Sequence, residues 1–175
     1  MEMLSNQPTI TIRAYEPSDW AGTWLILEPV FRAGETFPMS PGITEADAHT
    51  HWIEHPQATF VAVIEPESRI IGTYYLKPNS AALGAHVCNA GYIVSEAARR
   101  QGVAEAMGRH SLKTGSFMGF RAMQFNLVVS TNEASVRLWK KLGFHVVGTL
   151  PEAFKHAHLG YVDALVMYKM LELSE

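Results

Sequence analysis

The chain has 175 residues, 47% of them hydrophobic, which is enough for one domain with a sizeable core spanning residues 1–175. A formal net charge of −3 excludes the basic surface typical of nucleic-acid binding, and a single cysteine, Cys88, excludes an internal disulfide. The sequence shows no signal-peptide pattern and no apolar run long enough to cross a bilayer. We therefore expect a cytoplasmic protein without a membrane partner.

The first half of the chain alternates strand patterns with helix starts. Residues 9–13 alternate as a half-buried strand does. Ser18 and Thr44 are side chains that cap helix N-termini, and Asp47 completes a capping pattern with Thr44. In chain order we expect a strand at 9–13, a helix from 18 to about 31 that bends or breaks near Pro29, a short helix from 44 to about 54, and a hairpin of strands at 59–64 and 70–76.

The second half alternates strands and helices more regularly. The sequence predicts strands at 86–94 and 122–129, helices at 102–118 and 132–143, and closing strands at 144–147 and 161–170. Gly119 and Gly143 are placed to end the two helices. The helix at 102–118 is expected to turn one side to the core, formed by Val103, Ala106, Met107, His110, Thr114 and Phe117.

A basic loop between a strand and a helix, residues 99–104, carries the strongest functional signal. It follows the apolar strand that ends at Val94. A helix N-terminus offers free N–H groups and the positive end of the helix dipole, so it favours an anion. Gly102 admits a close backbone approach, and the arginines add positive charge. A phosphate or pyrophosphate is the expected ligand, held by the backbone of Arg100, Gln101, Gly102, Val103 and Ala104 with Arg99 nearby.

Two segments of the chain resemble the GNAT superfamily of acetyl-CoA-dependent N-acetyltransferases. The spacing Arg-x-x-Gly-x-Ala at 99–104 is similar to its pyrophosphate-binding signature. Residues 132–144, an Asn-x-x-Ser helix ending in Leu-Gly-Phe, are similar to its later motif. The resemblance implies an α/β (mixed α+β) acyltransferase fold, in which a central, mostly antiparallel twisted sheet is flanked by helices. It also implies acetyl-CoA as co-substrate, no metal, and cofactor contacts from Val94, Asn132 and Ser135.

Three further segments resemble one branch of that superfamily, which N-acetylates L-azetidine-2-carboxylate and related proline analogues. They are Gly72–Asn79, His86–Tyr92 and Phe125–Val128. By this resemblance Asn89 and Asn126 contribute to substrate recognition, and Asn132 lies near the reacting centre. The implied partner is a small-molecule amine, an amino or imino acid, and a homodimer is one form that the enzyme could take.

The three asparagines also have structural interpretations. Asn89 and Asn126 lie mid-strand among apolar neighbours, where a buried amide without partners costs about 1–3 kcal/mol. They either contact the substrate or satisfy backbone groups where the sheet splays. Asn132 is a preferred helix N-cap, and capping can coexist with a ligand contact.

Proton transfer has no obvious carboxylate base in this sequence. We expect water ordered by Asn126 or Asn132 to take the proton of the acceptor, with His86 as the alternative base. Cys88 is not expected to act as a nucleophile, because direct transfer needs no acyl-enzyme.

Trp139 stands where many GNAT enzymes carry a tyrosine that can protonate the leaving thiolate. An indole N–H is not a useful acid near neutral pH, so we predict a structural role for Trp139. Tyr92 and Ser135 are the alternative proton donors.

The histidines do not form a metal-binding pattern. His51 and His55 lie four residues apart on a predicted helix, but no third ligand follows at a convincing spacing. Two rival functions stay open at this stage: acetylation of a protein N-terminus or lysine, and non-catalytic sensing of an acyl-CoA.

Overall fold

Strand pairing forms a seven-stranded sheet in the computed structural model, which describes residues 9–172. Neighbouring strands are antiparallel except for β4 and β5, which are parallel. This confirms the expected mixed, mostly antiparallel sheet. Across the sheet the order is β1 (Thr9–Ala14), β2 (Ala58–Glu65), β3 (Arg69–Pro78), β4 (Val87–Val94), β5 (Ala122–Val129), β7 (Gly160–Met170) and β6 (His145–His156).

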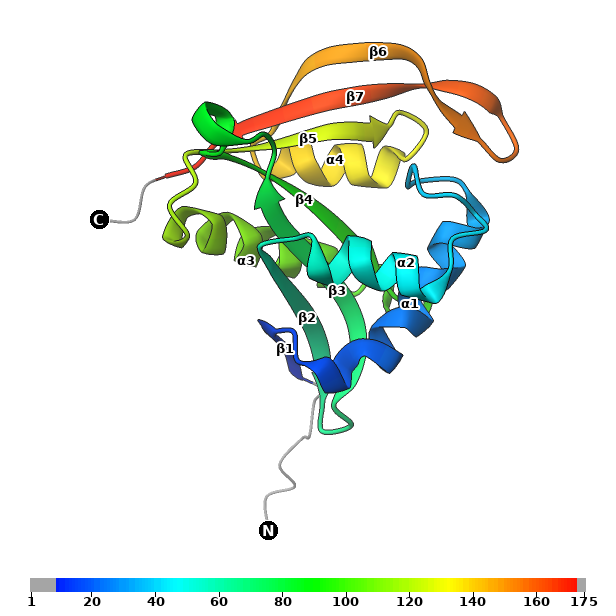
Figure 1. Cartoon of the computed structure of the whole chain (residues 1–175), viewed down its shortest axis with the longest axis vertical. Helices are drawn as coiled ribbons and strands as arrows, with labels where there is room; N and C mark the ends of the chain where they lie inside the picture. The colour runs from blue at the N-terminus through cyan, green and yellow to red at the C-terminus, as the bar shows by residue number, and fades with distance from the viewer. Residues whose placement is uncertain (1–8, 173–175) are drawn as a thin grey trace.

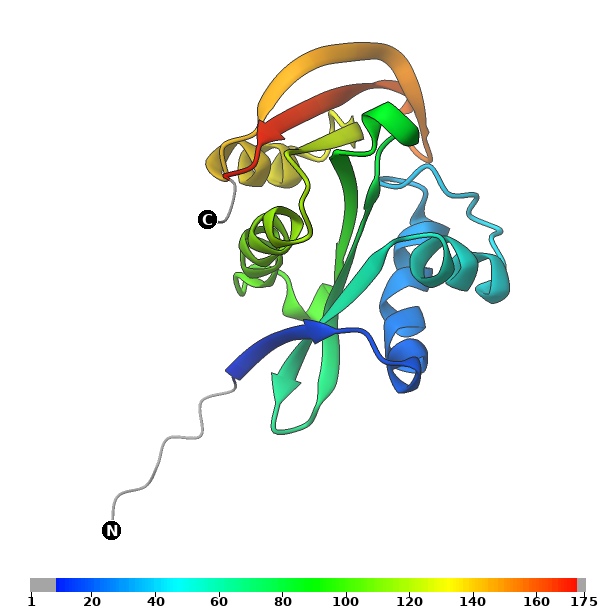
Figure 2. The same ribbon diagram turned by 60° about the vertical axis from the view of Figure 1, so that its left-hand side comes forward.

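Helices cover both faces of the sheet. They are α1 (Trp20–Ala33), α2 (Glu45–His49), α3 (Val103–Phe117) and α4 (Glu133–Lys141). The first two lie on one side of the sheet and the last two on the other (Figure 2). Each side has its own buried cluster, with Phe31 and Trp52 on the α1 side and Met107, Phe125 and Trp139 on the α3 side. Both faces of the central strands are therefore covered, and a binding site there requires a local break in the sheet.

The sheet opens between β4 and β5. The two strands pair only at Val87 with Ala122 and at Cys88 with Met123, and then diverge (Figure 1). From residue 89 to residue 94, the edge of β4 that faces β5 has no strand partner within residues 9–172. We call this opening the fork. Backbone N–H and C=O groups on such an edge are ready to pair with another chain or a ligand.

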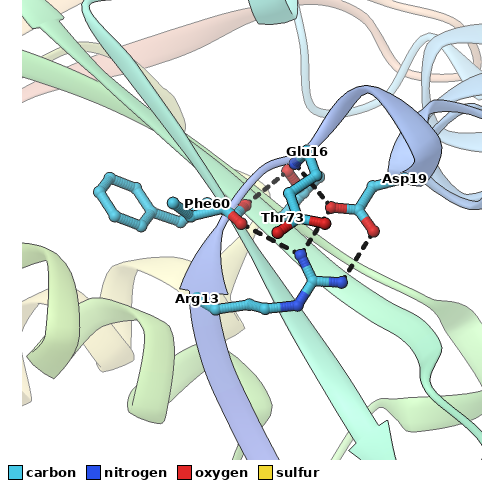
Figure 3. A network of polar contacts seen from close by, with 6 residues as sticks. Arg13, Glu16, Asp19, Phe60 and Thr73 are labelled. Atoms are coloured by element: carbon cyan, nitrogen blue, oxygen red, sulfur yellow. Dashed lines mark hydrogen bonds and ion pairs between the residues drawn. The ribbon is translucent and has the colours of Figure 1, made fainter.

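An ion pair ties β1 to the start of α1. The guanidinium of Arg13 donates to both carboxylate oxygens of Asp19, at 2.7 and 2.8 Å, and the Glu16 N–H donates to the same carboxylate at 2.8 Å (Figure 3). Asp19 is the N-cap residue of α1. The expectation that Ser18 caps this helix is therefore wrong, because a short 3₁₀ turn at Pro17–Asp19 moves the start of α1 by one residue.

The predicted order of strands and helices is confirmed. The Thr44 hydroxyl accepts from the Asp47 N–H at 3.1 Å, as the capping pattern predicts, and a π-helical turn extends the short helix to Glu54. The helix α1 continues through Pro29 rather than breaking there. None of the helices in the described part of the chain is long and apolar enough to cross a bilayer.

Two elements differ from expectation. Phe117 is 85% exposed, because the buried side of α3 is turned toward its small residues Gly108, Ser111 and Gly115. A Cβ at Gly108 would lie 2.6 Å from the Leu142 side chain, so this helix packs closely through glycine. The strand β6 extends to His156 instead of ending near residue 147, and almost all of it is exposed.

Candidate active site

The basic loop lies between β4 and α3 as predicted. Gly102 is the N-cap of α3 with φ 79°, and Arg100 is also left-handed with φ 61°. Residues alternating in this way turn successive N–H groups toward one point, which suits an anion. The first hydrogen bond of the helix runs from the Ala106 N–H to the Gly102 carbonyl, at 2.9 Å, so the preceding N–H groups of the first turn are left for a ligand.

The surroundings of this loop also fit a phosphate ligand. A Cβ built at Gly102 meets nothing within 4 Å, so the space above it is open. The side chains of Arg99 and Arg100 are exposed, and neither forms an ion pair within residues 9–172. The residues present can therefore hold the pyrophosphate of a coenzyme at the N-terminus of α3.

The strand that ends at Val94 leads from this loop into the fork. Val94 pairs with Gly72 of β3 on one side, and the Ser95 N–H donates to the Ile71 carbonyl at 2.8 Å. The other edge of β4 faces the fork. An extended ligand entering from the loop can therefore pair with the backbone of β4, as a strand would.

Three asparagine side chains meet just beyond the last β4–β5 pair. The Oδ1 atom of Asn79 accepts from Nδ2 of Asn89 at 3.2 Å and from Nδ2 of Asn126 at 2.6 Å. The Oδ1 atom of Asn126 in turn accepts from Gln124 at 2.9 Å. We call Asn79, Asn89 and Asn126 the amide cluster. It connects the segment directly after β3 to β4 and β5 through side chains, where the backbone no longer joins β4 to β5.

This arrangement brings the two predicted substrate residues together and adds a third. Asn126 is exposed and Asn89 half-buried, so neither is the fully buried amide that the apolar neighbours suggested. The hydrogen bonds of these two side chains go to other side chains rather than to backbone groups of the diverging strands. The sequence does not single out Asn79, because it follows Pro78 beyond the strand expected at 70–76; in the structure Asn79 lies directly after the end of β3 at Pro78.

The helix α4 presents Asn132 at its start. The Oδ1 atom of Asn132 accepts from the Ser135 N–H at 3.4 Å, so the capping interpretation holds. Trp139, one turn further on, is 7% exposed and its ring lies 4.7 Å from the rings of Tyr92 and Phe125. This packing agrees with a structural Trp139. Ligand roles for Asn132 and Ser135 stay predictions.

Burial affects two of the other titratable candidates near the fork, Tyr92 and Cys88, and a base role for His86 stays a prediction. Burial raises the pKa of the Tyr92 phenol well above its usual range, and its hydroxyl is hydrogen-bonded to Ser111 at 2.7 Å. Burial also raises the pKa of the Cys88 thiol to about 12, which keeps it protonated. His86 precedes β4 at the closed end of the fork, where its carbonyl accepts from the Arg121 N–H at 2.8 Å.

Metal-binding clusters are absent from residues 9–172: no three His, Cys, Asp or Glu side chains are grouped to hold an ion. His49 instead bonds to Glu54 at 2.9 Å, and the rings of His51 and His55 contact each other.

Comparison with known proteins identifies the family to which this chain belongs. The model of the acetyltransferase (GNAT) family matches residues 23–144. The N-acetyltransferase aca1 of Schizosaccharomyces pombe is 30% identical over 148 residues, which cover 76% of this chain and 71% of that protein. A GCN5-related N-acetyltransferase structure from Kribbella flavida is 39% identical with a TM-score of 0.88, and the match covers 93% of this chain and 98% of that one.

More distant structures share the fold. A phosphinothricin acetyltransferase from Sinorhizobium meliloti, solved with acetyl-CoA, is 19% identical with a TM-score of 0.82, over 93% of this chain and 89% of that one. The fold, the loop at α3 and these matches establish that the chain belongs to the acetyltransferase (GNAT) family. It is an acetyl-CoA-dependent N-acetyltransferase.

Proposed function

We propose that this chain transfers the acetyl group of acetyl-CoA to the nitrogen of a small amino or imino acid, such as a proline analogue. The observation that carries the proposal is the amide cluster. It sets polar side chains of β4, of β5 and of the residue directly after β3 at the edge of the fork, on the face of the sheet that α1 and α2 cover. Amides both donate and accept hydrogen bonds, which suits an acceptor that carries a carboxylate and an amine.

The cofactor half of the site is expected to lie along the loop and the free edge of β4. The backbone of residues 100–104, with Arg99, would hold the pyrophosphate, and β4 up to Val94 would pair with the pantetheine arm. Asn132 and Ser135 lie at the start of α4, where they can contact the same arm. Bound acetyl-CoA supplies an acetyl group that is already activated as a thioester.

The protein's own contribution is then chiefly orientation. Fixing two reactants in attack geometry removes much of the entropic barrier of a bimolecular step. The amide cluster orients the acceptor nitrogen toward the fork, and backbone N–H groups on the free edge of β4 can donate to a carbonyl oxygen there. The proton of the acceptor passes to water ordered by Asn126 or Asn132.

The test compares substrates in the wild type and two variants. Asn89→Ala and Asn126→Ala should each lower kcat/KM for L-azetidine-2-carboxylate or L-proline by about 10- to 150-fold, the range expected for a lost hydrogen bond to a charged group. The KM for acetyl-CoA should change little. Steady-state kinetics with both substrates varied measures this directly.

An exposed amide outside the cluster provides the matched control. Gln57→Ala should leave all kinetic constants close to those of the wild type. If the wild type acetylates peptides and no proline analogue, the small-acceptor assignment is wrong and the protein-acetylating function replaces it. The cytoplasmic location, the single domain and a homodimer stay predictions from the sequence.

A further inference from the structure

A lysine without a counter-ion lies beside the amide cluster. Lys77 is half-buried on β3, opposite Asn89 of β4, and it forms no ion pair within residues 9–172. Its Nζ atom lies 5.4 Å from the centre of the Tyr75 ring. An aromatic face attracts an ammonium group but does not neutralise it. The charge of Lys77 is therefore available to an anion at this point.

Tyr75 adds a hydrogen-bond donor on the same face. Its ring packs edge-on against Trp52, with centroids 4.9 Å apart, and lies across Gly91, its partner on β4. A Cβ at Gly91 would lie only 2.7 to 3.0 Å from the edge and hydroxyl of the Tyr75 ring. Gly91 is thus what allows the phenol to lie over the segment of β4 that borders the fork.

The Tyr75 hydroxyl is a donor rather than a base. Burial raises the pKa of this phenol to about 12, so it stays protonated at working pH. It makes no hydrogen bond to any other residue in the described part of the chain. Its proton is therefore free for a ligand.

Strand geometry places these groups together. Residues two apart in a strand share a face, so Tyr75, Lys77 and Asn79 follow one another on the face that also carries Asn89. The ammonium, the phenol and the amide N–H groups of this strip are all donors. No acidic side chain bonds to any of them within residues 9–172. A strip of donors with one uncompensated positive charge complements a carboxylate.

The pyrophosphate of the coenzyme is not the partner of Lys77. Lys77 pairs with Asn89, whereas the basic loop at 99–104 follows the other end of β4, which is Val94. At about 3.3 Å per strand residue, Asn89 and Val94 alone are roughly 16 Å apart. The charge on Lys77 thus serves a second ligand on the acceptor side of the fork.

We infer that Lys77 and Tyr75 bind the carboxylate of the acceptor, so that the enzyme selects amines that carry a carboxylate over amines whose neighbouring group is an amide. This inference rests on the proposed function and names the group that sets its specificity. A peptide N-terminus has a neutral amide at that place and gains nothing from Lys77.

The experiment compares L-proline with L-prolinamide, which differ in this charge. The wild type should prefer the carboxylate. Lys77→Met should lower kcat/KM for L-proline by about 10- to 100-fold, mainly through KM, while L-prolinamide changes less than about threefold. Lys77→Arg should restore part of the preference. Tyr75→Phe should also lower kcat/KM for L-proline. The exposed Lys113 of α3 gives the matched control, Lys113→Met.

A binding measurement separates this inference from the proposed function. Calorimetry with CoA-saturated protein should show L-proline binding that Lys77→Met weakens and Lys113→Met does not. If neither amine is acetylated, the proposed function fails, but this binding result still decides the role of Lys77. An unchanged preference in Lys77→Met, in both kinetics and binding, would overturn the inference. Thermal unfolding confirms that each variant is folded.

Discussion

Trp139 belongs to an aromatic cluster that spans the sheet and α4. Its ring contacts those of Tyr92, Phe125 and Phe144, and its edge lies against Gly108 of α3. A residue so surrounded fixes the distance between the two helices on this face. Trp139 stands where many family members carry a tyrosine that donates a proton. The indole N–H of Trp139 cannot replace that phenol as an acid.

Trp139→Phe should therefore affect stability more than catalysis. The smaller ring leaves part of the space empty, and we expect a loss of about 1–2 kcal/mol in the free energy of unfolding. The kcat should stay within about tenfold of the wild type, measured under conditions where both proteins are folded. A fall of more than ~100-fold, the scale of a lost transition-state hydrogen bond, would show that the indole N–H takes part in the reaction.

The residues of the proposed site differ in how readily the sequence predicts them. Asn89 and Asn126 were predicted as substrate residues because they interrupt apolar strands and match a family pattern. Asn79 and Lys77 were not, because Pro78 lies between them and indicates a loop. The strand β3 nevertheless extends to Pro78, and only the pairing of Lys77 with Asn89 reveals that Lys77 lies beside the amide cluster.

At the scale of elements, sequence periodicity predicted the bounds of strands that have a buried face. It did not predict the bounds of the exposed strand β6. The bounds of β5 were predicted correctly at 122–129. In β6 almost every residue is exposed, and its pairing with β7 shifts register twice, so no alternation marks its length. The face of α3 was misjudged because glycine and serine carry little hydrophobic signal, yet they permit the closest packing.

The ion pair between β1 and α1 predicts how stability depends on pH. The hydrogen bond from Arg13 holds the pKa of Asp19 below its usual range. A carboxyl whose pKa is lower in the folded state stabilises the fold above the unfolded value near 3.9, and this contribution is lost as pH falls through the folded value. Arg13→Gln should therefore destabilise the protein near pH 7, and the difference from the wild type should shrink below about pH 4.

The size of this effect follows from exposure. The Asp19 side chain is 8% exposed but that of Arg13 is 37% exposed, so solvent screening reduces the cost at pH 7 to about 1–2 kcal/mol. Urea unfolding at pH 7 and pH 3.5 measures both values. The exposed pair of Arg137 and Glu133 is the control, and Arg137→Gln should change stability by less than about 0.5 kcal/mol. An equal loss for Arg13→Gln at both pH values would contradict the electrostatic explanation.

At the scale of the whole molecule, the fork lies between the basic loop and the amide cluster, which we propose as the coenzyme and acceptor sites at opposite ends of β4. The parallel strands β4 and β5 pair over two residues and then diverge. On their outer edges β4 pairs with β3 and β5 pairs with β7. From the end of β4 the chain passes through the basic loop into α3, which returns along the sheet to β5, so the basic loop and the fork both belong to one crossover connection. Substitutions in the loop should therefore affect the coenzyme without altering the amide cluster.

The rise of Tm on coenzyme binding tests whether the basic loop holds acetyl-CoA in the intact protein. A ligand at about 100 times its Kd stabilises the folded state by about 2.7 kcal/mol, which for a chain of this size raises Tm by roughly 5–10 °C. Acetyl-CoA should produce this rise in the wild type. Gly102→Glu should abolish it, because a carboxylate would occupy the space where phosphates must lie. Gly102→Ala and Gly102→Gln are the controls: all three variants carry the cost of a left-handed residue, about 1–2 kcal/mol, but only Gly102→Glu adds negative charge. We expect Gly102→Ala to keep most of the rise and Gly102→Gln to fall between the two. A full rise of Tm in folded Gly102→Glu would show that the coenzyme binds elsewhere.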